Sequence, residues 1–337
     1  MKKVLVSGYI GFNNFGDEAI FYVLSTHLKN LGFDISVLCG NIQETQKKYE
    51  VKTYKYKSLV QILKAVLGCD ILISGGGSLL QNKTSNFSLF YYLFIIFLAK
   101  ICFKKVIIFA QGFEKISGII PEYITKFILK TVNFISVRDE KSKNYLKKLN
   151  IDSILVSDPA YSLVQDMKPF DDKQGLIVQL REFKGIDDNF ISTLADIVAK
   201  KYQGKVSVFS FQDEIDEKKC LKFVEEMKKN NVQAEYICEK SIDKTIQILN
   251  EAKYVISTRL HGLIISNALK TKTFAIAYDE KNKTLCKELN IQNIDILNYT
   301  DNELDNKLDE FFNHCLNEVH PYRRFEWDCI DNELNKN

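Results

Sequence analysis

The stretch STRLHGL, residues 257–263, marks the point at which a predicted strand gives way to a predicted helix. A short apolar run at 254–256 precedes it, and a helix-like apolar run at 263–269 follows it. In open α/β sheets, binding and catalytic groups gather at the carboxyl ends of the strands. The stretch therefore predicts a parallel α/β fold, and it places Arg259 and His261 where such a fold builds its sites.

Short β-rich runs alternate with helical runs along the whole chain. Strands are expected at residues 4–7, 35–38, 71–74, 106–110, 134–137 and 154–156, and then at 176–180, 206–211, 234–237, 254–257 and 273–277. Alternation of this kind indicates parallel sheets joined by crossover helices. We therefore expect an α/β fold made of two Rossmann-like domains that face each other across a cleft.

The domain boundaries follow from the same pattern. A polar stretch at 166–174, which contains Pro169, separates the two series of strands and is typical of a linker. It predicts an N-terminal Rossmann-like domain at 1–165 and a C-terminal one at 166–300. The remaining residues, 301–337, are polar and helical, and they form a tail that could pack back on the first domain.

Composition narrows the class of protein. The chain has 337 residues, of which 46% are hydrophobic and 26% are charged, as in soluble globular proteins. Its 46 basic and 43 acidic residues nearly balance, which argues against nucleic acid as a partner. The eight cysteines form no CxxC pair, and no group of residues has the spacing of a metal site. We therefore expect a cytoplasmic protein with reduced cysteines and with neither a metal nor another cofactor.

One apolar stretch, residues 86–103, is open to two interpretations. It is almost uncharged, rich in aromatic residues and interrupted only by Lys100. It is shorter than the roughly 20 residues that a membrane-spanning helix needs. It is therefore expected to be a helix buried between a sheet and its neighbour, or a helix that leans on a partner or on the inner face of a membrane.

Two glycine-rich loops follow predicted strands in the first half of the chain. Glycines let a backbone turn tightly and approach a ligand, and the helix start that follows each loop favours an anion. Neither loop has the GxGxxG spacing of a dinucleotide site, so a structural turn remains the alternative to a ligand-binding loop. The candidate residues are Asn13, Asn14, Gly16 and Asp17 in the first loop and Gly75, Gly76, Gly77 and Ser78 in the second.

Four cations follow four predicted strands, namely Arg138, Arg181, Arg259 and Lys281. Arginine binds carboxylate or phosphate through a planar fork, whereas lysine acts as a point charge. His261, two residues after Arg259, is a candidate for proton transfer at an anionic substrate, with a satisfied core histidine as the alternative. The acidic run at 213–217 is expected to be only the first turn of a helix.

Taken in order, these motifs resemble the signature of the polysaccharide pyruvyl transferase family. The matching motifs are SGY at 7–9, GFNN at 11–14, GDEA at 16–19, SGGGSLLQ at 74–81, VRDE at 137–140, DPA at 158–160, RLH at 259–261, and YD at 278–279 followed by Lys281. The resemblance extends from about residue 4 to 290. It is closest to the branch that pyruvylates the cell-wall glycan to which S-layer proteins attach.

The resemblance implies a fold like that of GT-B glycosyltransferases, phosphoenolpyruvate as donor, and an N-acetylmannosamine unit of an undecaprenyl-linked precursor as acceptor. The product would be a 4,6-ketal of pyruvate, with phosphate released. By the family pattern, Arg138, His261 and Lys281 match donor-binding and catalytic positions. We therefore expect His261 to be the general acid/base, the cations Arg138, Arg259, Lys281 and Arg181 to hold the donor, and the glycine-rich loops to shape the acceptor side.

Two other functions remain as alternatives. A GT-B glycosyltransferase with a nucleotide-sugar donor would use the same strand ends, and tight UDP binding would favour it. A glycan-binding protein without enzymatic activity would yield no product that depends on phosphoenolpyruvate.

Overall fold

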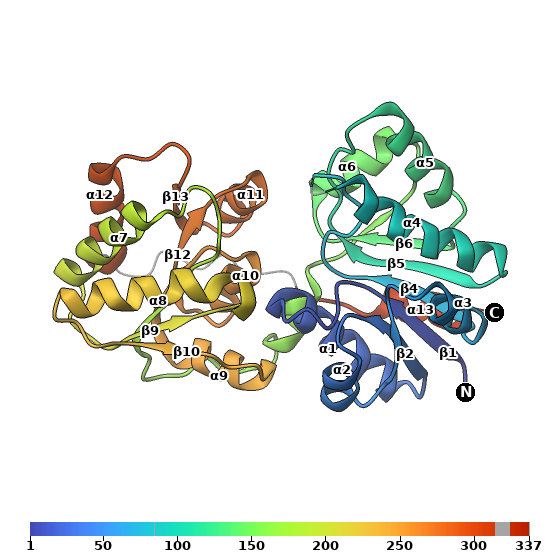
Figure 1. Ribbon diagram of the computed structural model, residues 1–337, viewed down its shortest axis with the longest axis horizontal. Coiled ribbons are helices and arrows are strands. Elements are labelled where there is room, and N and C mark those ends of the chain that lie inside the picture. Colours follow the sequence, from blue (N-terminus) through green and yellow to red (C-terminus); the bar gives the residue numbers. More distant parts are fainter. Residues whose placement is uncertain (84, 314–323, 337) are drawn as a thin grey trace. The chain divides into compact units, whose positions relative to one another are not determined.

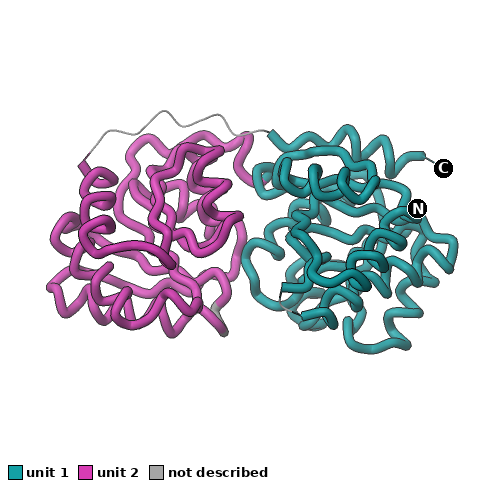
Figure 2. The backbone as a smooth tube through the Cα atoms, turned by 90° about the horizontal axis from the view of Figure 1, so that it is seen from above, with its two compact units in different colours: residues 1–162, 324–337 teal, residues 163–323 magenta. Residues whose placement is uncertain are grey.

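The computed structural model describes residues 1–83, 85–313 and 324–336, and the chain forms two compact units. Unit 1 comprises Met1–Ser162 and Arg324–Asn337, and unit 2 comprises Leu163–Arg323 (Figure 2). The first boundary falls in the 3₁₀ turn Pro159–Leu163, just before the polar stretch that is expected to be the linker. Each unit has its own sheet and its own hydrophobic core.

Unit 1 is built on a seven-stranded parallel sheet with the strand order β3-β2-β1-β4-β5-β6-β7. Its strands are β1 (Lys3–Ser7), β2 (Asp34–Cys39), β3 (Lys52–Lys55), β4 (Ile71–Gly75), β5 (Lys105–Gln111), β6 (Phe134–Val137) and β7 (Ile154–Leu155). Its helices are α1 (Phe15–Asn30), α2 (Ile42–Tyr49), α3 (Leu59–Leu67), α4 (Asn86–Ile101), α5 (Ile119–Leu129), α6 (Glu140–Lys148) and α13 (Asp328–Asn335). Figure 1 shows α1 and α2 together on one side of this sheet and α4 and α5 on the other. Because both faces are covered, the central strands have continuous apolar sequences.

Unit 2 repeats the same plan with six parallel strands in the order β10-β9-β8-β11-β12-β13. Its strands are β8 (Gln174–Gln179), β9 (Val206–Phe209), β10 (Ala234–Ile237), β11 (Ala252–Ser257), β12 (Lys272–Ala277) and β13 (Gln292–Asp295). Its helices are α7 (Asp188–Lys201), α8 (Asp213–Lys229), α9 (Ile242–Glu251), α10 (Leu260–Ala268), α11 (Glu280–Glu288) and α12 (Asp301–Asn313). Helix α7 packs between α8 and α12, and α10 packs between α9 and α11.

The strand order reverses once in each sheet, between β1 and β4 in unit 1 and between β8 and β11 in unit 2. At such a reversal the loops at the carboxyl ends of the two central strands run in opposite directions, and ligands of open α/β sheets bind in the crevice between them. The glycine-rich loops after β1 and β4 lie at this position in unit 1. In unit 2, Arg181 and Arg259 follow β8 and β11 and so lie at the corresponding reversal of strand order.

The structure confirms all eleven predicted strands to within two residues at each end, and it adds β3 and β13. Both additional strands lie at an edge of their sheet, and their sequences are the polar segments KTYK and QNID. An edge strand has no neighbour on one side and carries charged residues that discourage further pairing. Neither segment therefore contains the apolar run by which the other strands are recognised.

The segment after residue 300, expected as one tail, divides between the two units. Helix α12 packs on α7 and β13 in unit 2, whereas α13 belongs to unit 1. In unit 1, the Trp327 ring stacks on His27 at 3.7 Å between centroids, and Asp331 Oδ1 lies 2.7 Å from His27 Nε2. The end of the chain is thus tied to the first helix of the fold.

The apolar stretch at 86–103 forms helix α4, and its inner face contributes Leu89, Leu93 and Ile96 to the core of unit 1. Its outer face is different, because Phe94 and Phe97 are exposed. No helix in the described part of the chain combines the length and the apolarity that crossing a bilayer requires. The interpretation as a buried helix therefore holds for one face of α4 only.

Candidate functional site

In unit 2, the side chain of Arg259 is fixed along one edge by the start of helix α8. Its Nε and Nη2 donate to Asp216 Oδ2 at 3.0 and 2.6 Å, and Nη2 also donates to Gln212 Oε1 at 3.1 Å. Within the described residues, no hydrogen bond of Arg259 uses Nη1. The guanidinium is therefore held in one orientation with one terminal nitrogen available to a ligand.

Asp216, which anchors Arg259, is completely buried. Its other oxygen, Oδ1, accepts a hydrogen bond from the backbone N–H of Glu182 at 3.0 Å. Burial raises the pKa of the Asp216 carboxyl, and the neighbouring Arg259 opposes that shift. Because burying both charges costs free energy, this ion pair serves to position Arg259 more than to stabilise the fold.

Gln179, the last residue of β8, organises the loop that carries Arg259. Its buried Oε1 accepts hydrogen bonds from the backbone N–H groups of Thr258 and Arg259 at 3.2 and 2.9 Å, and from the Ser257 hydroxyl at 2.9 Å. Its Nε2 donates to the carbonyl of Leu180 at 2.9 Å. One side chain thus fixes the backbone at the ends of the two central strands.

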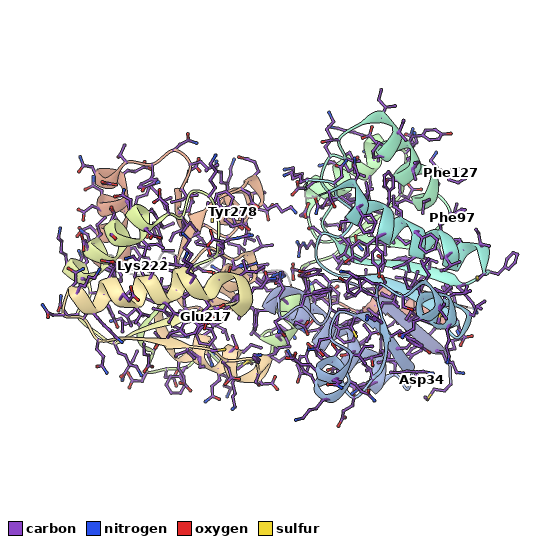
Figure 3. The ribbon with its side chains drawn as sticks, viewed as in Figure 1. Asp34, Phe97, Phe127, Glu217, Lys222 and Tyr278 are labelled. Atoms are coloured by element: carbon purple, nitrogen blue, oxygen red, sulfur yellow. The ribbon has the colours of Figure 1, made fainter. Side chains whose placement is uncertain are left out.

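A second arginine, Arg181, follows β8 and rests on an aromatic ring. Its guanidinium carbon lies 4.4 Å from the centroid of Tyr278, and its Nη1 donates to the tyrosine hydroxyl. Burial raises the pKa of Tyr278, so this hydroxyl stays protonated at neutral pH. Figure 3 labels Tyr278, which follows β12. Arg181 and Arg259 both act electrostatically on Asp216 and on Tyr278, so the structure brings these two predicted cations together.

His261 and Lys281 each occupy the first turn of a helix in unit 2. His261 is the second residue of α10, whose N-cap is Arg259, and Lys281 is the second residue of α11, whose N-cap is Asp279. Both are partly buried. The two helix starts are tied together, because Asn282 Nδ2 donates to the carbonyl of Thr258 at 3.0 Å.

In unit 1, Arg138 follows β6 and is held from two sides. Its Nη1 donates to Asp158 Oδ2 at 2.7 Å, and its Nη2 donates to the Ser78 hydroxyl at 3.3 Å. The side chains of Arg138 and Asp158 are 8% and 6% exposed, so this is a buried pair and not a surface pair with a sequence neighbour. Asp139 instead caps helix α6 through the backbone N–H of Ser142 at 2.7 Å.

Glycines occupy closely packed positions in the loops after β4 and β5. Gly76 and Gly77 have φ angles of +71° and +70°, which side chains rarely adopt. A Cβ on Gly77 would lie 2.4 Å from Asp17 Oδ1, at the start of α1. A Cβ on Gly112 would meet the Ser78 hydroxyl at 2.8 Å and Arg138 Nε at 3.2 Å. These contacts bring Asp17, the triple-glycine loop, Ser78 and Arg138 to one edge of the sheet.

The first glycine-rich loop is fixed from inside. Glu18 is buried, and its carboxylate accepts from the backbone N–H of Gly11 at 2.7 Å and from the hydroxyl of Tyr49. Asn14 caps helix α1 by accepting from Gly16 N at 3.2 Å, and Asn13 adopts a positive φ of 54°. Asn14 and Gly16 therefore have local structural roles, so their presence alone does not require a ligand.

Of the predicted donor-binding residues, the structure places Arg181, Arg259 and Lys281 in unit 2 and Arg138 in unit 1. The sequence interpretation missed the anchors Asp216, Gln212 and Gln179. Asp216 does lie in the first turn of α8 as expected, but it is the buried partner of Arg259 and not a solvated helix charge. The sequence signal for Gln179 is a polar residue directly after the apolar run at 176–178.

The chemistry available at these positions is that of anion binding. Unit 2 presents an oriented guanidinium, a second guanidinium on an aromatic ring, and the starts of helices α10 and α11, all of which favour phosphate or carboxylate. Among the described residues, no group of histidine, cysteine, aspartate and glutamate is arranged to hold a metal ion.

Comparison with solved structures identifies the fold. A UDP-GlcNAc 2-epimerase from Neisseria meningitidis bound to UDP-GlcNAc has a TM-score of 0.65 and 11% identity, with all of both chains covered. MnaA from S. aureus with UDP has a TM-score of 0.63 and 9% identity, covering 93% of this chain and 88% of that chain. MurG from Acinetobacter baumannii has a TM-score of 0.54 and 12% identity, covering 93% and 91%. These likenesses confirm the two-domain α/β fold of the GT-B type.

Comparison at the level of sequence identifies the family. No curated protein matches the chain. The model of the polysaccharide pyruvyl transferase family matches residues 14–280, which include GDEA at 16–19, the triple-glycine loop and RLH at 259–261. Because this match spans most of the sequence and both units, the chain belongs to the polysaccharide pyruvyl transferase family.

Proposed function

We propose that this protein transfers the pyruvyl group of phosphoenolpyruvate to an N-acetylmannosamine unit of a cell-wall glycan precursor, and forms a 4,6-ketal with release of phosphate. The observation that carries the proposal is the anchored guanidinium of Arg259, next to Arg181 and two residues before His261. A small donor with a phosphate and a carboxylate matches two neighbouring arginines. Family membership supplies the reaction class.

The proposed reaction needs two hydroxyl groups and no redox step. One sugar oxygen bonds to the central carbon of phosphoenolpyruvate while the methylene carbon gains a proton. The carbon–oxygen bond to phosphate then breaks, and the second sugar oxygen closes the ketal. Of the two hydroxyl protons, one ends on the new methyl group and the other leaves with phosphate, so atoms and charge balance.

His261 is the group we assign to proton transfer at the methylene carbon. It stands in the first turn of α10, next to the arginine that would hold the anion. A positioned acid/base group accelerates such a step by about 10²–10⁴-fold. Lys281, which matches a family donor position, joins the two arginines of unit 2 in the proposed donor-binding set. Arg138, in unit 1, is proposed as a donor-binding residue on the family pattern alone.

The acceptor side is assigned to the loops of unit 1. Asn13, Asp17, Gly77 and Ser78 lie at the carboxyl ends of β1 and β4, where polar side chains suit a sugar. The S-layer branch of the family, which the motifs resemble most, supports N-acetylmannosamine on an undecaprenyl-linked chain as acceptor.

Mass spectrometry of a synthetic β-N-acetylmannosaminyl disaccharide, incubated with protein and phosphoenolpyruvate, tests the proposal. We expect the acceptor to gain one pyruvate less one water, with one phosphate released for each product. Calorimetric titration with phosphoenolpyruvate and with UDP compares the affinities of the protein for the two candidate ligands. A chain that binds UDP tightly, transfers sugar from a nucleotide donor and leaves phosphoenolpyruvate intact is a glycosyltransferase, and the proposal fails.

A further inference from the structure

Helices α4 and α5 expose large apolar side chains to solvent on the outside of unit 1. Phe94 and Phe97 on α4 are each 42% exposed, and Phe127 on α5 is 57% exposed. Figure 3 labels Phe97 and Phe127, which project from these two neighbouring helices. At the starts of the same helices, Phe87 is 82% and Ile119 is 88% exposed. Single exposed apolar residues are ordinary, but adjacent helices that share them form an interaction surface.

Helix α3 extends this surface. It packs against α4, which in turn packs against α5, and all three helices bury their inner faces in one core cluster. On its outer side, Leu59 is 69%, Val60 is 78% and Leu67 is 57% exposed. We call the outer side of α3, α4 and α5 the apolar face. Water-facing sides of helices are normally polar, so this face needs an explanation that folding alone does not supply.

The charge around the apolar face is predominantly positive. The segments 57–67, 86–104 and 115–131, which contain the three helices, hold seven lysines and one acidic residue. The lysines are Lys57, Lys64, Lys100, Lys104, Lys115, Lys126 and Lys130. The single acid, Glu122, accepts a hydrogen bond from the Tyr145 hydroxyl at 2.9 Å. The chain as a whole is nearly balanced, so this excess is local.

We infer that the apolar face docks unit 1 on the surface of an anionic lipid bilayer. Exposed aromatic and aliphatic side chains combined with lysines are the signature of helices that lie in a membrane interface. Lysines near an anionic surface add electrostatic attraction that falls with salt. A second copy of this chain is a poor occupant, because two such faces brought together would oppose seven lysines to seven lysines.

One end of the apolar face lies on the same side of the sheet as the site loops of unit 1. Helix α4 begins shortly after the loop at Gly75–Gly77, so its N-terminal end lies on the side of the sheet where the strands end. Phe87 and Ile119, at the starts of α4 and α5, carry the apolar face to that side. A lipid-linked acceptor would then be presented to the loops from the bilayer. This last consequence rests on the proposed function, whereas the docking itself does not.

Flotation of the full chain with lipid vesicles tests the inference without any enzymatic readout. Vesicles of phosphatidylcholine alone are compared with vesicles that also contain phosphatidylglycerol, at low and high salt. We expect binding to the anionic vesicles and a marked loss at high salt. Failure of the protein to float with anionic vesicles at low salt overturns the inference.

Two triple variants, each with a matched control, locate the contact. Phe94→Ser/Phe97→Ser/Phe127→Ser should lower partitioning at least tenfold. The control Ile215→Ser/Leu221→Ser/Leu297→Ser replaces apolar side chains of unit 2 that are 45%, 42% and 58% exposed. This control should leave partitioning to the vesicles unchanged.

Lys64→Glu/Lys115→Glu/Lys130→Glu should lower binding about 100-fold or more, since each lysine near an anionic surface strengthens it about fivefold. Its control, Lys200→Glu/Lys218→Glu/Lys228→Glu, changes the same number of exposed lysines in unit 2. Thermal melting confirms that all variants fold. Equal losses in variants and controls, or a dimer in sedimentation that the phenylalanine variant dissociates, would show that the face does not bind lipid.

Discussion

Replacing Asp216 with asparagine should loosen Arg259 while leaving the fold in place. The carboxylate accepts from Glu182 N at Oδ1 and from Arg259 Nε and Nη2 at Oδ2. Asparagine has the same shape but only one acceptor oxygen. In either orientation of the amide, its NH₂ group faces a donor, the backbone of Glu182 or the guanidinium of Arg259. The side chain can therefore satisfy one partner and must repel the other.

The expected magnitudes differ for stability and for activity. A buried donor without an acceptor costs about 1–3 kcal/mol of unfolding free energy. Removing a charge whose burial raises its pKa offsets part of that cost. Displacing a substrate-binding group by about 1 Å lowers turnover on the order of 100-fold. We therefore expect a modest stability loss and a fall in kcat/KM for phosphoenolpyruvate of about 100-fold.

Urea unfolding and initial rates of phosphate release in the presence of acceptor measure the two effects. Glu217→Gln is the matched control, because Glu217 is the next residue on α8 and is exposed (Figure 3). If Asp216→Asn lowers stability as expected but its kcat/KM equals that of the control, the orientation of Arg259 does not matter for the reaction. The role assigned to the anchor would then be refuted.

Three further predictions concern other parts of the fold. His261→Ala should lower turnover by about 100-fold or more with unchanged thermal melting, and near-normal turnover would remove His261 from the mechanism. Gly76→Ala should destabilise unit 1 by about 2 kcal/mol or more in urea unfolding, because its Cβ would meet the buried Ile20 at 2.4 Å from Cγ2 and 3.2 Å from Cβ, in addition to the backbone strain at positive φ. Gly32→Ala, also at positive φ but with nothing within 4 Å, is the control and should cost less. Burial lowers the pKa of Lys173 from 10.5 to about 8, so the folded state loses this proton before the unfolded state does. Stability should therefore rise as the pH increases from about 8 toward 10.5, and Lys173→Met should abolish that rise in urea unfolding; an equal rise in the variant would assign it to other groups.

The sequence predicts the fold well because the physical cause of each central strand is local. A strand covered on both faces needs a continuous apolar run, and such runs are visible in β4, β5 and β11 without knowledge of any neighbour. The same reasoning places Arg138, Arg181 and Arg259 at strand ends. It fails for β3 and β13, whose polar sequences become strands only through pairing with β2 and β12.

The partners of the cations were not predictable, because they depend on contacts between distant elements. Asp216 lies 43 residues from Arg259 in the chain, and Asp158 lies 20 residues from Arg138. Helical periodicity shows on which side of α8 Asp216 lies. It does not show which strand end the first turn of α8 packs against. The division of the segment after residue 300 has the same cause, since the sequence of α13 does not show that Trp327 stacks on His27.

The contacts of Arg138 and Arg259 rank two cations that the sequence treats as equals. Both terminal nitrogens of Arg138 are engaged, Nη1 by Asp158 and Nη2 by Ser78. Arg259 is held along the edge formed by Nε and Nη2, which leaves Nη1 for a ligand. An anion that approaches the end of the Arg259 guanidinium can therefore accept a hydrogen bond from Nη1. At Arg138 it must share nitrogens that already donate to Asp158 and Ser78. Arg259 is thus better arranged to bind the donor directly, and Arg138 is better arranged to hold together the loops that carry Ser78 and Asp158.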